Sequence, residues 1–257
     1  MVSTLRKWAA CALLFGAAGL FGYVLYEYSC YPKPTRLSSG DVFFVVSALL
    51  GTLLALFGIA TNRTWGRWLG LAIGVSSVGL IGTMSLAGPE PIRWTILPIL
   101  ASGGSAALIL LLIGPSMAQR LGSKGNPFAR SGGRRASLLG MAVVLSLAAV
   151  PTLWAWAWVG SAGQHLSRGM ALAAVGLLGL GALLIIWERT AGLLALLVGG
   201  SLATILALMV LVAGSQQVTI SWQIGVQWLL AAAGGIVAMI ATARPVCRVL
   251  AGKPPVA

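Results

Sequence analysis

Long apolar runs separated by short polar breaks dominate the chain. Eight such runs can be marked, at residues 8–26, 42–61, 68–87, 94–114, 137–158, 169–187, 191–213 and 223–243. A helix needs about 20 apolar residues to cross the roughly 30 Å hydrocarbon core of a bilayer. The runs lack the period-two alternation of barrel strands. The pattern therefore predicts an all-α, polytopic transmembrane helical bundle of about eight helices.

Composition agrees with a protein whose solvent is lipid. Of the 257 residues, 58% are hydrophobic and only 8% are charged. A soluble domain carries roughly 25% charged residues, because its surface must face water. The formal charge of +13 is spread between the apolar runs, where basic residues act as topology signals and contact anionic lipid headgroups. We therefore expect the lipid bilayer as a partner, and no nucleic acid.

Basic residues also predict the orientation of the chain. Both ends and alternate connections carry thirteen of them: Arg6, Lys7, Arg63, Arg67, Arg120, Lys124, Arg130, Arg134, Arg135, Arg189, Arg244, Arg248 and Lys253. The other connections carry four: Lys33, Arg36, Arg93 and Arg168. Cytoplasmic loops are rich in lysine and arginine. The asymmetry predicts a multi-pass protein with both termini in the cytoplasm, in a membrane of the bacterial cytoplasmic (inner) type.

The two halves of the chain resemble each other weakly. The stretch Arg63-Thr64-Trp65-Gly66 matches Arg189-Thr190-Ala191-Gly192 at an offset of 126 residues, and Gly74 falls on Gly200 at the same offset. Four helices in each half would make a parallel 4+4 repeat. The predicted organisation is a membrane half at 1–115, a basic, Gly/Ser-rich cytoplasmic linker at 116–136, and a second membrane half at 137–257.

Chemistry-bearing side chains are missing from the middle of every predicted span. No Asp, Glu, Lys, Arg or His lies there, although such residues usually mark ion pathways and proton relays. The hydroxyls at depth, such as Ser146 and Thr204, are expected to bond their own helix or a neighbouring one. Histidine occurs once, as His165 in an outer loop, and no metal cluster or phosphate loop is seen. We therefore predict no catalytic residues, no metal and no cofactor.

Small residues give the clearest positive signal. Glycines spaced four residues apart let helix backbones approach closely in a membrane. The predicted helix-packing positions are Gly66, Gly70, Gly74, Gly176, Gly179, Ala182, Gly192 and Gly200. Glycine pairs in the fourth and eighth runs occupy similar places in the two halves, and paired soft spots can mark a substrate site. The predicted solute path comprises Ser102, Gly103, Gly104, Ser105, Gly234 and Gly235.

Three functions remain open at this point. The favoured one is a membrane scaffold, accessory subunit or assembly partner of a larger complex, with a membrane-protein partner or a second copy of the chain bound to it. The alternative is a transporter or facilitator that moves a small neutral or lipophilic solute between the two halves. An enzyme acting at the outer interface through Asp41, Glu90 and His165 is the least favoured, because those residues form no recognised motif.

Overall fold

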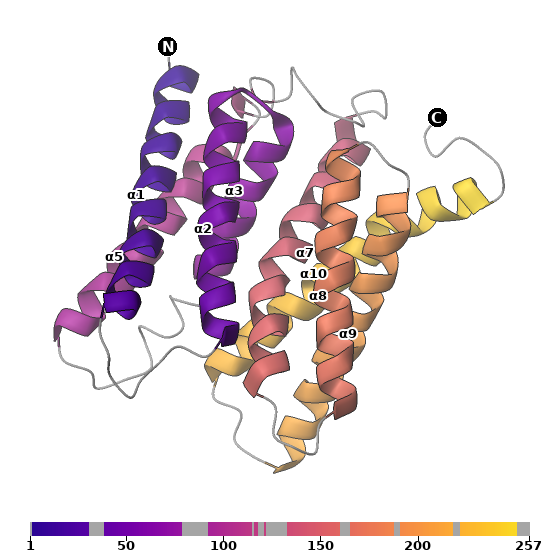
Figure 1. The fold of residues 1–257 in the computed structure, drawn as a ribbon. Helices are drawn as coiled ribbons and strands as arrows, with labels where there is room; N and C mark the ends of the chain where they lie inside the picture. The colour runs from indigo at the N-terminus through magenta and orange to yellow at the C-terminus, as the bar shows by residue number, and fades with distance from the viewer. Residues whose placement is uncertain are drawn as a thin grey trace. The chain divides into compact units, whose positions relative to one another are not determined.

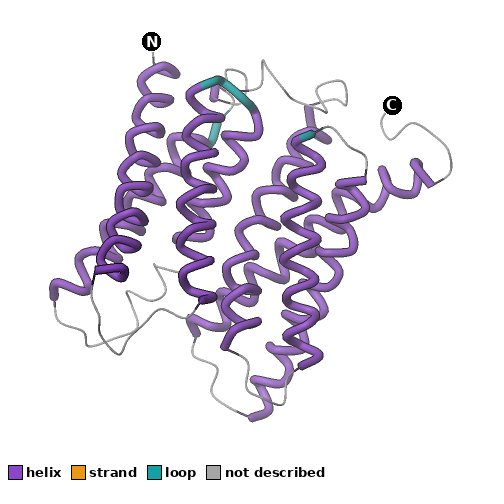
Figure 2. The backbone as a smooth tube through the Cα atoms, viewed as in Figure 1, coloured by secondary structure: helices purple, strands orange, loops and turns teal. Residues whose placement is uncertain are grey.

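The structure is a computed structural model that describes residues 2–30, 39–78, 92–114, 116–117, 121, 133–159, 165–187, 191–217 and 222–250. These residues form eight helices: α1 (Val2–Cys30), α2 (Ser39–Ala60), α3 (Thr64–Ser77), α5 (Ile92–Leu112), α7 (Gly133–Val159), α8 (His165–Ile186), α9 (Ala191–Gln217) and α10 (Trp222–Leu250). No strand occurs among them (Figure 2). Each predicted apolar run falls on one helix, although the second half of the run 68–87 lies outside the described residues.

Five of these helices are long and apolar enough to cross a membrane. Their candidate spans are Ser3–Tyr26, Leu138–Ala157, Arg168–Ile185, Ala191–Val212 and Gly225–Arg248. Within the described residues, the apolar parts of α2 and α5 are shorter, at Val45–Ala60 and Leu100–Leu112. Helix α3 has 14 described residues. The all-helical prediction is confirmed, and five of the eight predicted spans have the length that a crossing requires.

The chain divides into two compact units. Unit 1 comprises Met1–Val78 and Ile99–Asn126, and unit 2 comprises Gly79–Pro98 and Pro127–Ala257. In unit 2, α7 packs against α8 and α10, and α9 packs against the same two helices. In unit 1, α2 packs against α1 and α3, and α5 contacts both α1 and α3 through side chains described below. Figure 1 shows α1 to α5 in indigo to magenta and α7 to α10 in rose to yellow.

Small residues line the helix contacts of unit 2, and large apolar residues cover much of its outside. On α9 the buried positions include the small residues Gly192, Gly199, Gly200, Ala203 and Ala207, together with Leu193, Leu196 and Leu206. The same helix exposes other large side chains: Leu194, Val198, Ile205, Leu208, Met209 and Val212. In water this surface would be unfavourable, whereas lipid accepts it and small residues let helices pack closely.

Unit 1 also turns large apolar side chains outward. Phe15 on α1 and Leu110 on α5 are each 70% exposed, and Phe57 on α2 is 61% exposed. Exposing many large apolar side chains to water is unfavourable, whereas exposing them to lipid is not. Together with the five candidate spans, this distribution identifies a multi-pass membrane protein.

Candidate functional site: basic side chains at the helix ends of unit 1

The turn between α2 and α3 closes most of the C-terminal end of α2. The last four carbonyls of a helix have no partner inside the helix. Backbone amides of the turn satisfy three of them: Thr61 N to Phe57 O (2.9 Å), Asn62 N to Ile59 O (3.1 Å) and Arg63 N to Gly58 O (2.7 Å). Asn62 adopts a left-handed φ of 58°, a conformation that asparagine tolerates better than most residues.

The fourth carbonyl of α2 is bound by a lysine from another helix. Lys7, in the first turns of α1, donates from Nζ to Ala60 O at 2.8 Å and to Asn62 Oδ1 at 2.9 Å. The side chain is only 6% exposed. Its ammonium lies against the negative end of the α2 dipole, where a cation is favoured. Lys7 therefore fastens α1 to the end of α2.

Two arginines close the end of α5 in the same way. Arg6 donates from Nη2 to Leu110 O at 2.6 Å and to Ile113 O at 2.8 Å. Arg67, on α3, donates from Nε to Leu112 O at 2.9 Å. Burial lowers the pKa of the Arg67 guanidinium below its ordinary value, because desolvation disfavours the charged form. The α5 terminus is thus tied to α1 and α3 at once.

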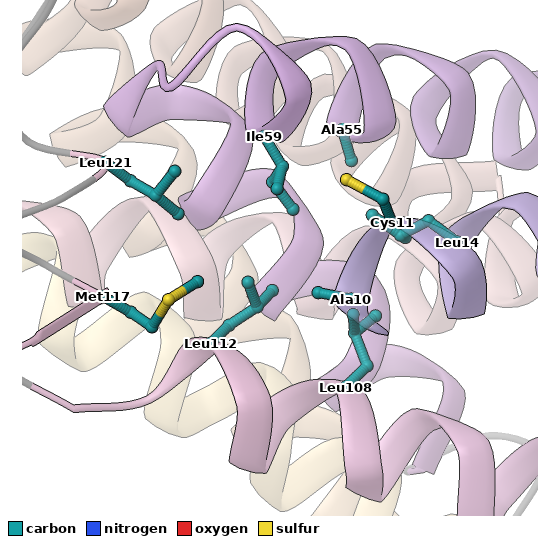
Figure 3. Close-up of a cluster of buried hydrophobic side chains, with 9 residues drawn as sticks. All are labelled: Ala10, Cys11, Leu14, Ala55, Ile59, Leu108, Leu112, Met117 and Leu121. Atoms are coloured by element: carbon teal, nitrogen blue, oxygen red, sulfur yellow. The ribbon is translucent and has the colours of Figure 1, made fainter. Parts of the chain in front are cut away.

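Residues just beyond α5 pack beneath this end of unit 1. Met117 and Leu121 are fully buried, and Thr64 Oγ1 donates to Leu121 O at 3.1 Å. They join one hydrophobic cluster with side chains from α1, α2 and α5: Ala10, Cys11, Leu14, Ala55, Ile59, Leu108 and Leu112 (Figure 3). Both residues fall in the predicted linker 116–136. Their apolar side chains, four residues apart, extend unit 1 beyond the predicted boundary at 115.

Three of the thirteen basic residues that predict orientation therefore hold the protein together. Arg6, Lys7 and Arg67 make charge-assisted hydrogen bonds to helix carbonyls. The side chain of Arg63 is exposed and makes no hydrogen bond to the described residues. We call Arg6, Lys7, Arg63 and Arg67 the basic end of unit 1. The side chains of the outer candidates Asp41, Glu90 and His165 lie outside the described residues.

Glycines of α3 lie at contacts with both of its neighbours. A Cβ placed on Gly66 would overlap the backbone of Gly58 and lie 2.5 Å from Ile59 N, both in α2. A Cβ on Gly74 would lie 3.3 Å from Ser105 O and 2.7 Å from Ile109 Cγ1, both in α5. A Cβ on Gly70 would approach Leu112 Cδ1 at 2.8 Å. At Gly66 a side chain would push α2 away, because it would meet backbone. At Gly70 the added Cβ would meet only the ends of the Leu112 and Ile59 side chains, which can shift.

Unit 2 shows matching contacts along α9. A Cβ on Gly192 would lie 2.8 Å from Ile185 N in α8, and one on Gly200 would lie 2.9 Å from Gly235 O in α10. Ala182 of α8 is also buried, at 2% exposure. The predicted glycine positions on α9 therefore both lie at helix contacts.

The glycines predicted for packing on α8 occupy a different face. A Cβ on Gly176 or Gly179 would meet no atom within 4 Å, so neither lies at a helix contact in the structure. The contact on this helix is made at Gly181, where a Cβ would lie 2.9 Å from Leu196 N. Gly181 was not among the predicted packing positions. Only the small size of Gly181 could have indicated a helix contact there, and Gly176 and Gly179 on the same apolar helix share that property.

Residues of the predicted solute path fall into two kinds of surroundings. A Cβ on Gly103 or Gly104 would meet no atom within 4 Å, and Ser105 offers its carbonyl to the Gly74 contact. Gly234 instead packs against Leu145 O in α7, and Gly235 packs against Gly200 and Thr204 in α9. Ser102 is half-buried on α5. The space beside Gly234 and Gly235 is thus occupied by the neighbouring helices α7 and α9.

Hydroxyl groups at depth mostly bond their own helices. Thr204 Oγ1 donates to Gly200 O at 2.9 Å, and Ser201 Oγ donates to Leu197 O at 2.8 Å. Thr52 makes the same bond to Ala48 O at 2.7 Å. Ser146 Oγ is buried without a partner among the described residues. The expected self-bonding is confirmed for the first three side chains.

Among the described residues, no three His, Cys, Asp or Glu side chains gather as a metal site requires. What the arrangement does chemically is to neutralise helix ends and close helix contacts. Comparison of the chain with protein-family models, with curated proteins and with solved structures finds no match.

Proposed function

We propose that this protein is a non-catalytic membrane component: a scaffold, an accessory subunit or an assembly partner of a larger membrane complex. One observation carries the proposal. Three charged side chains of unit 1 are used to hold helices to one another, as Lys7 holds α1 to the Ala60 carbonyl of α2. Tightly packed helices with a broad apolar exterior suit a protein that acts by contact.

The proposed setting is a bacterial cytoplasmic membrane crossed eight times, with both termini in the cytoplasm. The charge asymmetry of the loops supports this orientation. The basic end of unit 1 supports it too, because it gathers the N-terminus of α1, the α2–α3 turn and the end of α5. Those three segments share one side of the membrane in an eight-span topology.

We also propose that the two halves are a parallel repeat. At the offset of 126 residues, Gly66 corresponds to Gly192 and Ile59 to Ile185, and each glycine lies against the amide nitrogen of the corresponding isoleucine. Farther along, Gly74 meets a carbonyl of α5 as Gly200 meets a carbonyl of α10. These contacts support duplication beyond the shared composition.

Purification of the full chain in a mild detergent tests the scaffold, with mass spectrometry of whatever co-elutes. A protein that co-elutes in fixed stoichiometry, and is absent from a mock purification of another membrane protein, is the expected result. Recovery of the chain alone from several detergents, with a bound small solute instead, would refute the scaffold and favour transport.

A facilitator of a small neutral or lipophilic solute is the second candidate. Paired glycines in corresponding helices favour it, because such pairs can mark a substrate site, and a Cβ on Gly103 or Gly104 of α5 would meet no described atom within 4 Å. Its test is solute uptake into liposomes that contain the purified protein, with and without an imposed pH gradient. We expect any flux to be independent of the gradient. Gradient-driven accumulation that disappears in Asp41→Asn or Glu27→Gln would show a proton-coupled carrier.

A further inference from the structure

We propose that the basic end of unit 1 binds the phosphate of an anionic membrane lipid, held by Arg6, Arg63 and Arg67. The inference rests on the proposed function in one respect, since it requires this end of the bundle to lie at the level of the lipid headgroups. It goes further by naming the ligand class and the side chains that contact it.

The two anchored arginines keep most of their hydrogen-bond donors. A guanidinium has five N–H bonds in a planar fork. Toward the described residues, Arg6 donates only from Nη2, to two carbonyls, and Arg67 donates only from Nε. Their carbonyl partners lie within one turn of α5, between Leu110 and Ile113, so the two guanidinium groups are held near each other. The remaining donors suit the oxygens of a phosphate, which arginine binds in a bidentate manner.

The start of α3 adds to the same positive region. Arg63 precedes α3 and is exposed, and no side chain caps the first turn of the helix by a hydrogen bond. The positive end of the helix dipole favours an anion on this side of unit 1. Arg67 projects from this same first turn and is anchored at the end of α5 beside Arg6. A phosphate beside the end of α5 would therefore meet arginines from both α1 and α3.

The charge of this end calls for an external anion. Among the described residues, the acceptors that Arg6, Lys7 and Arg67 meet are peptide carbonyls and the Asn62 amide. Two helix ends supply only about half a negative charge each, against four cationic side chains. Trp8, 58% exposed beside them, is typical of the interface between lipid chains and headgroups. A lipid phosphate fits both the charge and the depth better than a free ion.

Native mass spectrometry of the full-length protein provides the test. Phosphatidylglycerol, zwitterionic phosphatidylcholine and inorganic phosphate are added in turn to protein in detergent. We expect retention of phosphatidylglycerol over phosphatidylcholine. Arg63→Gln should lower that retention about fivefold, which is the contribution of one basic residue at a lipid surface. The variant should remain folded, because the exposed Arg63 side chain makes no hydrogen bond to the described residues. Arg244→Gln, which removes an exposed arginine of α10, is the matched control and should leave retention unchanged.

Three outcomes would overturn the proposal. Equal losses in Arg63→Gln and Arg244→Gln would show diffuse attraction to the whole basic surface. Displacement of the lipid by millimolar inorganic phosphate would assign the site to a free anion. Retention unaffected by either variant would place the lipid elsewhere. Each leaves the scaffold untouched, since that proposal is decided by a co-eluting protein.

Discussion

Gly58 and Gly66 meet backbone against backbone across the turn that joins α2 to α3. A Cβ on either residue would fall on the backbone of the other helix, so replacing either glycine by a larger residue would separate the two helices. The pair sets the distance between α2 and α3 next to the Asn62 turn. This contact gives the sharpest stability predictions for unit 1.

Gly66→Ala should destabilise the bundle by about 1–3 kcal/mol, because the added methyl meets backbone that no side-chain rotation relieves. Thermal unfolding in detergent, followed by helical circular dichroism, measures the change. Gly51→Ala on α2 is the control, since a Cβ there meets nothing within 4 Å. Equal melting temperatures for the two variants would mean that α2 and α3 do not pack at Gly66.

Lys7→Met should also destabilise the protein by about 1–3 kcal/mol. Methionine keeps the length and apolar character of the side chain, but it leaves the Ala60 carbonyl and Asn62 Oδ1 without their charged donor. The same unfolding assay applies, with Arg244→Met as the control for loss of an exposed positive charge. A Lys7→Met protein as stable as the control would contradict the capping role.

Glycines on the two faces of α8 should respond differently. Gly181→Ala should lower stability by about 1–3 kcal/mol, because its Cβ would approach Leu196 N at 2.9 Å. Gly176→Ala should change stability by less than about 1 kcal/mol, since the position faces open space. If Gly176→Ala were the more damaging of the two, the packing face of α8 would be the one that sequence alone suggested.

Reporter fusions test the proposed topology. A reporter active only outside the cytoplasm should give signal after residue 33, 90, 165 or 217, and none after residue 63, 124 or 253. The reason is the excess of lysine and arginine on the second set of segments. A control reporter that works only in the cytoplasm should show the opposite pattern. A reversed position between two correct ones would remove both of the spans that flank it, and the eight-span assignment would then be wrong.

Helix positions were predictable because hydrocarbon thickness imposes a length. The run 191–213 became α9 at Ala191–Gln217, and the run 223–243 became α10 at Trp222–Leu250. Both helices contain a candidate membrane span. The prediction needed only residue type and spacing, since every backbone polar group in lipid must be satisfied within the segment.

The inward faces of the helices were less predictable. Helices such as α8 are apolar all round, so the period of the sequence does not separate the side that meets a neighbour from the side that meets lipid. Size was the remaining signal, and α8 offers several small residues. Gly176, Gly179 and Gly181 are equivalent by composition, and only tertiary contact with Leu196 separates Gly181 from the others.

The basic end of unit 1 lay beyond sequence reasoning for a different reason. Lys7 and Ala60 are 53 residues apart, and Arg6 and Leu110 are 104 apart. A lysine near the start of a membrane helix has an adequate explanation as an orientation signal. Its second role appears only when the carbonyl ends of α2 and α5 are placed beside it.

The placement of glycines at the contacts between helices has a consequence for how this protein would diverge. Leucine, isoleucine, valine and methionine make nearly equivalent contacts with a lipid tail. The exposed residues Leu208 and Ile240 can therefore be replaced by another of these four residue types. Gly235 cannot be replaced in this way, because it touches Thr204 and Gly200 at once. During evolution the sequence of the apolar exterior would therefore change fastest. We expect a distant homologue to be recognised by the spacing of its glycines and threonines, while the identities of the surrounding apolar residues differ.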